Sequence, residues 1–192
     1  MSSIFTGSVY KATLLWDILK HAYDPKDLFP WWNRVDKYLY LGAIPLINKN
    51  HLVQLKELGV STVITVLEQF EMETDTYISQ PVKQADWEAN DVVNHIVETP
   101  DYNPIELKKI IDTVDFMHSQ IKGGHTIYIH CKSGKGRSPT LLACYILKYG
   151  LSMGRKFDTP DEVIEYIKEK RTIINLNDSQ KKIIYEYWQT ML

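Results

Sequence analysis

A cysteine and an arginine in one short loop have the spacing that phosphate chemistry requires. Five residues separate Cys131 from Arg137, and two of them are glycines, Gly134 and Gly136. A loop of this length wraps around one tetrahedral oxyanion, because its backbone N–H groups and the N-terminus of a following helix point inward. Glycine permits the positive φ angles that such a loop needs. The guanidinium of Arg137 can grip two phosphate oxygens, and Cys131 then lies where its sulfur can attack phosphorus.

The other loop residues fit the same interpretation. We expect Lys132, Ser133 and Lys135 to bind the substrate together with the two glycines, the lysines adding positive charge for a polyanionic headgroup. The alternative is that both lysines point to solvent. Ser138, directly after the arginine, is expected to donate a hydrogen bond to the departing thiolate. For the stretch as a whole, the alternative is a buried cysteine followed by a basic turn.

These residues resemble a known active site. The run His130-Cys131, five residues, Arg137-Ser138 resembles the catalytic loop of the protein-tyrosine and dual-specificity phosphatases. Residues 31–36 and the turn at 41–45 resemble the lipid-directed subfamily related to mitochondrial phosphatidylglycerophosphate phosphatase. The loop lysines resemble those of the phosphatase-and-tensin-homologue lipid phosphatase. The resemblance spans about residues 30–190. It implies hydrolysis of a phospholipid headgroup such as a phosphoinositide or phosphatidylglycerophosphate.

A general acid is needed to protonate the leaving oxygen, and Asp101 is our candidate. It follows a predicted strand at 95–98, and the cysteine follows another at 126–129, with a predicted helix between them. Right-handed crossovers between parallel strands bring both residues to the same carboxyl edge of the sheet. The family's acid also falls at this place. Other carboxylates remain as alternatives: Asp86, Asp91 and Glu98.

The chemistry that follows is a two-step hydrolysis through a phosphocysteine. A free thiol with a pKa of about 8.5 is only a few per cent ionised at neutral pH. Full ionisation therefore gains only about thirtyfold in thiolate, and nucleophilicity falls as the pKa falls. Most of the acceleration must come from binding the transferring phosphoryl group. We expect no metal and no cofactor, because Arg137 and the backbone dipoles supply the charge.

The elements that must position these groups alternate between strands and helices. The pattern predicts an α/β domain with a mostly parallel central sheet flanked by helices, and the resemblance implies a protein-tyrosine-phosphatase-like fold. Asn103 is expected to cap the helix that precedes the catalytic strand, with Pro104 at its first position. The predicted strands are 38–41, 62–67, 95–98 and 126–129; the predicted helices are 50–58, 104–122, 138–149, 160–170 and one from 177 or 178 to the end.

Two segments keep more than one interpretation. Residues 8–22 are predicted to form a helix that either packs onto the domain or lies on a membrane surface. Its expected apolar stripe is Val9, Ala12, Leu15, Trp16, Leu19 and Ala22. This helix belongs to an N-terminal extension of residues 1–29, followed by a catalytic domain of residues 30–192. Residues 68–71 hold acidic side chains in the subfamily, but Gln69 departs from that pattern, and a solvated loop is an equally good interpretation.

Composition limits the other possibilities. The 192 residues suffice for one domain and carry a formal net charge of −2, which argues against a general nucleic-acid binder. Cys131 and Cys144 make neither a disulfide framework nor a zinc cluster, so we expect a reducing intracellular compartment, with Cys144 in the core. We see no secretory signal and no run of 18 apolar residues. We therefore expect a monomer that is cytoplasmic or peripheral on a membrane.

Two rival functions remain open at this stage. A dual-specificity protein phosphatase would act on phosphotyrosine and phosphoserine or phosphothreonine with the same loop. A catalytically silent module would bind phosphate without turnover. Intact Cys131, Arg137 and Ser138 argue against the silent module. We therefore expect an enzyme, with a phosphorylated lipid or a phosphoprotein as its partner.

Overall fold

A five-stranded sheet runs through the centre of the computed structural model, which describes residues 10–16, 18–20, 29–76 and 79–192. The strands are β1 (Trp32–Asp36), β2 (Leu39–Gly42), β3 (Val60–Thr65), β4 (Val93–Ile96) and β5 (Thr126–His130), in the order β1-β2-β5-β3-β4. Only the β1–β2 pair is antiparallel. The predicted mostly parallel α/β sheet is therefore confirmed, with β5 at its centre.

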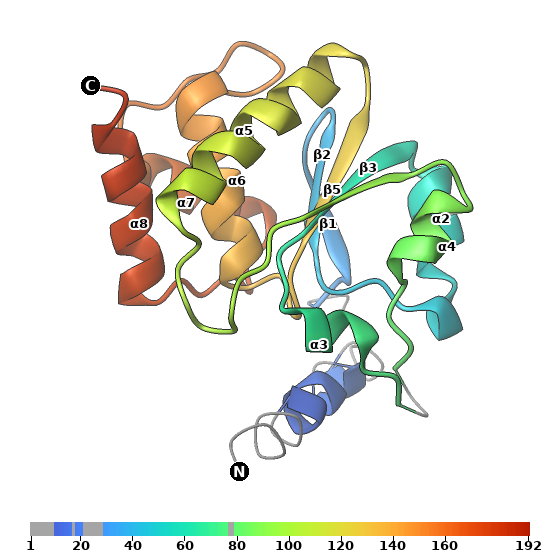
Figure 1. Cartoon of the computed structure of the whole chain (residues 1–192). Coiled ribbons are helices and arrows are strands. Elements are labelled where there is room, and N and C mark those ends of the chain that lie inside the picture. The colour runs from blue at the N-terminus through green and yellow to red at the C-terminus, as the bar shows by residue number, and fades with distance from the viewer. Residues whose placement is uncertain (1–9, 17, 21–28, 77–78) are drawn as a thin grey trace.

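Helices cover both faces of the sheet (Figure 1). They are η1 (Ile47–Lys49), α2 (His51–Glu57), α3 (Gln69–Glu73), α4 (Gln84–Glu88), α5 (Leu107–Lys122), α6 (Arg137–Tyr149), α7 (Pro160–Lys170) and α8 (Asp178–Gln189). Helices α5 to α8 share one large core with Ile127 and Ile129 of β5. Tyr128 points to the opposite face and packs with residues of α2 and α4. Alternation along β5 thus fills both cores at once.

Several element boundaries differ from the prediction. The sequence pattern missed β1 as a strand, and β4 ends at Ile96. Helix α5 begins at Leu107, so the predicted cap at Asn103 is wrong. The reason is a turn, in which the Asn103 N–H donates to the carbonyl of Pro100 at 3.1 Å while Tyr102 has a positive φ of 62°. Buried Ile105 then anchors the loop before the helix starts.

The N-terminal helical segment (residues 10–16 and 18–20) buries a different face from the predicted one. Tyr10, Leu14 and Ile18, at a spacing of four, join the main core. Leu15, Trp16 and Leu19 of the predicted stripe are exposed instead, Trp16 by 60%. The two apolar stripes overlap on one helix, and the buried one contains the tyrosine that finds a hydrogen-bond partner inside. Ala12 is also exposed, and Val9 and Ala22 lie outside the described residues.

No helix among the described residues is long and apolar enough to span a bilayer.

Candidate active site

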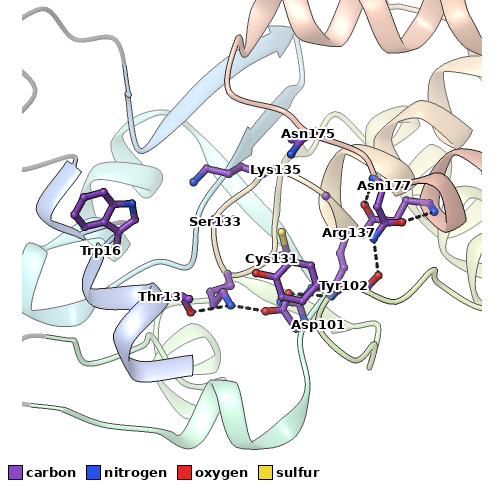
Figure 2. Close-up of a pocket in the computed structure, with 13 residues that line it drawn as sticks. Thr13, Trp16, Asp101, Tyr102, Cys131, Ser133, Lys135, Arg137, Asn175 and Asn177 are labelled. Atoms are coloured by element: carbon purple, nitrogen blue, oxygen red, sulfur yellow. Dashed lines mark hydrogen bonds and ion pairs between the residues drawn. The ribbon is translucent and has the colours of Figure 1, made fainter. Parts of the chain in front are cut away.

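A cavity of about 400 Å³ opens where β5 ends and α6 begins. Cys131, Arg137, Asp101 and Trp16 are among the residues that line it (Figure 2). Ser133, Lys135 and Gly136 also line it. The loop that joins β5 to α6 therefore forms the floor, as the spacing of Cys131 and Arg137 predicts.

The buried thiol of Cys131 lies in surroundings that favour the thiolate. Burial alone would raise its pKa. The charge of Arg137 and hydrogen bonds from the Ser138 hydroxyl and the N–H groups of Ser138 and Gly134 outweigh burial, so the pKa lies below the usual thiol value. The Ser138 hydroxyl donates to the sulfur at 3.3 Å. The surroundings of Cys131 therefore favour the form of the thiol that a nucleophile requires.

The guanidinium of Arg137 is held by a carboxylate that the sequence left open. Its Nη1 and Nη2 donate to the two carboxylate oxygens of Glu71, at 2.6 Å and 3.0 Å. Nη1 also donates to the carbonyl of Thr99 at 2.9 Å. Both side chains are almost fully buried, with 1% of Arg137 and 0% of Glu71 exposed. These contacts hold the guanidinium of Arg137 in place at the wall of the cavity that Cys131 also lines.

The burial of Glu71 decides between the two interpretations of residues 68–71. They form the start of α3, and the interpretation as a solvated loop is wrong for Glu71. The carboxylate of Glu71 also accepts a hydrogen bond from the N–H of Glu68 at 2.9 Å, which caps the helix. Glu71 is the buried partner of Arg137, and the sequence signals it only by its place after β3.

Asp101 lines the same cavity as Cys131 and has two cationic partners. Its Oδ1 is 3.0 Å from Nη2 of Arg137, and its Oδ2 contacts the ammonium of Lys132. The side chain is 28% exposed, so it faces the cavity. Asn177, at the start of α8, donates to the carbonyl of Tyr102 at 2.7 Å and pins this loop. Asp101 and Cys131 therefore line the same cavity, as the crossover argument predicts.

The alternative acids lie elsewhere. Asp86 caps α4 through the N–H of Lys83, Asp91 lies in a turn with a φ of 57°, and Glu98 lines a separate cavity. None of the three lines the cavity that holds Cys131.

Lys132 does not point to solvent. Only 6% of the residue is exposed, and its ammonium donates to the hydroxyl oxygen of Thr13 at 3.2 Å as well as contacting Asp101. The rings of Tyr10 and Tyr102 lie 5.4 Å and 5.7 Å from it. The solvent-facing alternative is thus wrong for Lys132. Lys135 lines the cavity and is half-buried (Figure 2).

Arg171 holds the loop from its outer side. Its Nε donates to the carbonyl of Gly134 and its Nη2 to that of Ser133, both at 3.1 Å. Its Nη1 reaches Pro30 and Asn33 in the segment before β2. Gly134 has a φ of 68°, and a side chain there would collide with the backbone of Gly42. The sequence missed Arg171, because a single arginine after a helix carries no signal of burial.

His130 is not a base for the cysteine. Burial lowers its pKa to about 3, so the imidazole is neutral at physiological pH. Its Nε2 lies 3.0 Å from the hydroxyl of Thr65, inside the sheet.

Across the described part of the chain, no group of three or more His, Cys, Asp or Glu side chains could hold a metal ion.

Comparison with known proteins agrees with this geometry. The family model described as the dual specificity phosphatase catalytic domain matches residues 39–190. The chain is 30% identical over 182 residues to phosphatidylglycerophosphate phosphatase PTPMT2 of Arabidopsis thaliana, covering 93% of this chain and 71% of that protein. PTPMT1 of the same plant is also 30% identical, but the chain spans only 49% of its length.

A mouse relative and a solved structure extend the comparison. The chain is 27% identical over 180 residues to mouse phosphatidylglycerophosphatase and protein-tyrosine phosphatase 1, covering 93% of this chain and 87% of that protein. The crystal structure of PTPMT1 in complex with PI(5)P superposes with a TM-score of 0.69 at 28% identity, over 84% of this chain and 96% of that one.

Proposed function

The chain belongs to the dual specificity phosphatase family and is a phosphatase, and we propose that it removes a phosphomonoester from a phospholipid headgroup through a phosphocysteine at Cys131. One observation carries the chemical part of this proposal. The thiol of Cys131 with a lowered pKa, the buried guanidinium of Arg137 and the carboxylate of Asp101 line a single cavity.

In the first step, a sulfur lone pair of the Cys131 thiolate forms the P–S bond while the P–O ester bond breaks. The electron pair of the ester bond goes to the leaving oxygen, which takes a proton from Asp101. Arg137 and the loop N–H groups bind the equatorial oxygens, whose charge is best matched when the phosphoryl group is in transit. Asp101 is close enough to Arg137 to deliver its proton at the same phosphate.

In the second step, Asp101 accepts a proton from water, and the water oxygen attacks phosphorus as the P–S bond breaks. The Ser138 hydroxyl, already 3.3 Å from the sulfur, stabilises the departing thiolate. Inorganic phosphate leaves, and the enzyme returns to its starting state. The residues that would bind the phosphoryl group are Lys132, Ser133, Gly134, Lys135 and Gly136.

The lipid substrate is supported by the relatives and by the charge of the loop. The Arabidopsis relatives are named for phosphatidylglycerophosphate, and PTPMT1 has been solved with PI(5)P. Lys135 adds a positive charge at the cavity, where a second anionic group of a headgroup would lie. A protein phosphatase is the second candidate, because the name of the mouse relative includes protein-tyrosine phosphatase activity.

The exposed face of the N-terminal helix supports contact with the membrane that carries such a lipid. Leu15, Trp16 and Leu19 form this face, and Trp16 also borders the cavity. An amphipathic helix with a tryptophan on its apolar side binds in the interfacial region of a bilayer. We therefore also propose that residues 1–29 are a membrane-contacting extension of a catalytic domain at 30–192. A reducing compartment would keep the nucleophile competent.

The test compares four substrates with wild-type enzyme and the Cys131→Ser variant. They are phosphatidylglycerophosphate, PI(5)P, a phosphotyrosine peptide and p-nitrophenyl phosphate. We expect a higher kcat/KM for a lipid than for the peptide, and no turnover by the variant. Rapid acid quench of the wild-type enzyme should yield protein carrying one phosphate on Cys131. Turnover by Cys131→Ser would overturn the nucleophile, and a preference for the peptide would favour the protein phosphatase.

A further inference from the structure

The N-terminal helical segment reaches the catalytic groups at two points. Tyr10 donates a hydrogen bond from its hydroxyl to the backbone carbonyl of Glu71 at 3.1 Å. Thr13 accepts one from the ammonium of Lys132 at 3.2 Å (Figure 2). Leu14 and Ile18, buried in the main core, fix the helix in this position. The helix is thus bound to the domain next to the reacting groups.

The first link runs from Thr13 to the proposed acid. The Thr13 hydroxyl donates to the carbonyl of Tyr10 at 3.0 Å, so its oxygen lone pairs are available to the ammonium of Lys132. The same ammonium contacts the carboxylate of Asp101. A lysine side chain has many rotamers, and fixing its end requires more than one partner. Thr13 and the flanking rings of Tyr10 and Tyr102 supply those partners.

The second link runs from Tyr10 to the phosphate-binding arginine. Burial and the nearby charge of Glu71 raise the pKa of Tyr10, so its hydroxyl stays protonated and can donate. The ring also packs edge-on against Phe70 at 5.5 Å between centroids. Both contacts hold the start of α3, whose Glu71 carboxylate grips Arg137 at both Nη atoms.

We propose that Thr13 and Tyr10 are positioning residues: Thr13 acts through Lys132 on Asp101, and Tyr10 acts through Glu71 on Arg137. This inference rests on the proposed roles of Asp101 and Arg137. A general acid works only within hydrogen-bond reach of the leaving oxygen, and a displacement of about 1 Å can cost up to about a hundredfold in rate. Asp101 lies on a loop, where such displacements are easiest.

The two links predict different kinetic signatures. Loosening Asp101 slows alkyl phosphates, whose poor leaving oxygen needs a proton, and spares aryl phosphates, which need little protonation. Loosening Arg137 slows both substrates, because each must bind the phosphoryl group. A merely structural role of the helix would reduce both rates together with Thr13→Val as well. With Tyr10→Phe it would reduce them only near the unfolding transition, so the rates are measured well below the Tm of each variant.

The experiment uses the full chain with glycerol phosphate and p-nitrophenyl phosphate, both of which are soluble. Thr13→Val removes the acceptor at constant shape, Thr13→Ser retains it, and Lys11→Gln changes an exposed residue of the same helix. We expect Thr13→Val to lower kcat/KM for glycerol phosphate about tenfold and for the aryl phosphate less than about twofold. Thr13→Ser and Lys11→Gln should stay within about twofold on both, and Tyr10→Phe should reduce both several-fold.

The Asp101→Asn background separates this inference from the proposed function. There, Thr13→Val should add no further loss, because the acid through which it acts is gone. Equal losses on the two substrates with Thr13→Val, or no loss at all, would overturn the Thr13 link; unchanged rates with Tyr10→Phe would overturn the Tyr10 link. If Asp101→Asn itself spares glycerol phosphate, the assignment of the acid fails, and the Thr13 link fails with it. Cys131→Ser tests the nucleophile independently of both.

Discussion

Replacing Glu71 by glutamine should damage both the stability of the protein and its activity. The carboxylate of Glu71 accepts three hydrogen bonds, two from Arg137 and one from the N–H of Glu68. A glutamine amide has one oxygen, and its NH₂ group must then face one of these donors. The variant also leaves the guanidinium of Arg137, of which 1% is exposed, without its buried counter-charge.

The expected size of the effect follows from this burial. Removing one partner of a buried ion pair costs about 3–5 kcal/mol in the free energy of unfolding. In a protein of this size, each kcal/mol lowers Tm by about 2–4 °C, so Tm should fall by about 6–20 °C. The kcat/KM for p-nitrophenyl phosphate should fall about ten- to a hundredfold, because the guanidinium of Arg137 is no longer fixed.

The assay combines thermal unfolding with kinetics well below both Tm values. Glu73→Gln is the matched control, since Glu73 is exposed on the same helix, and its unfolding free energy should change by less than about 0.5 kcal/mol. The double variant Glu71→Met with Arg137→Met should recover stability without activity, because apolar side chains replace buried charges well. A Glu71→Gln enzyme that keeps wild-type stability and activity would refute the role of this pair.

Three further changes test other parts of the site. Asp101→Asn should slow glycerol phosphate about 10²–10⁴-fold and p-nitrophenyl phosphate far less; equal losses in kcat/KM would place the acid elsewhere. Lys135→Ala should lower kcat/KM for phosphatidylglycerophosphate about two- to fivefold more than for p-nitrophenyl phosphate, and high salt should remove that gap. Burial lowers the pKa of His130 to about 3, so the unfolded chain binds more protons than the fold below about pH 6.5, and stability should fall by on the order of 4 kcal/mol between about pH 6.5 and 3. Chemical denaturation of His130→Asn should show a flatter dependence on pH, and an unchanged slope would contradict a buried neutral His130.

Local patterns predicted the loop between β5 and α6 and the last helices well. Cys131 and Arg137 lie at a spacing that few other structures require, and the strand and helix around them have uniform apolar character. Helix α7 starts where the pattern of Thr159 and Pro160 predicts, with the Thr159 hydroxyl accepting from the N–H of Glu162. Such signals lie within a few residues of one another, so they are readable without tertiary structure.

The residues that hold the site together carried no comparable signal. Glu71 lies 66 residues from Arg137, and Arg171 lies 37 from Gly134, so neither contact is visible in a local window. A charged residue in a sequence is also most often on the surface, and burial with a partner is the exception. The prediction of the buried face of the N-terminal helix was wrong for another reason. Its two apolar stripes overlap, and the packing of Tyr10, Leu14 and Ile18 in the main core decides which is buried.

The two carboxylates beside Arg137 differ in their burial, and on the proposed mechanism this difference separates their roles. Glu71 contacts Nη1 and Nη2 end-on from the protein interior, where no substrate can displace it. Asp101 lies 3.0 Å from Nη2 and lines the cavity, where a phosphate would bind. A substrate therefore competes with Asp101 but not with Glu71. The buried carboxylate fixes the arginine throughout the cycle, while the exposed one is free to move a proton.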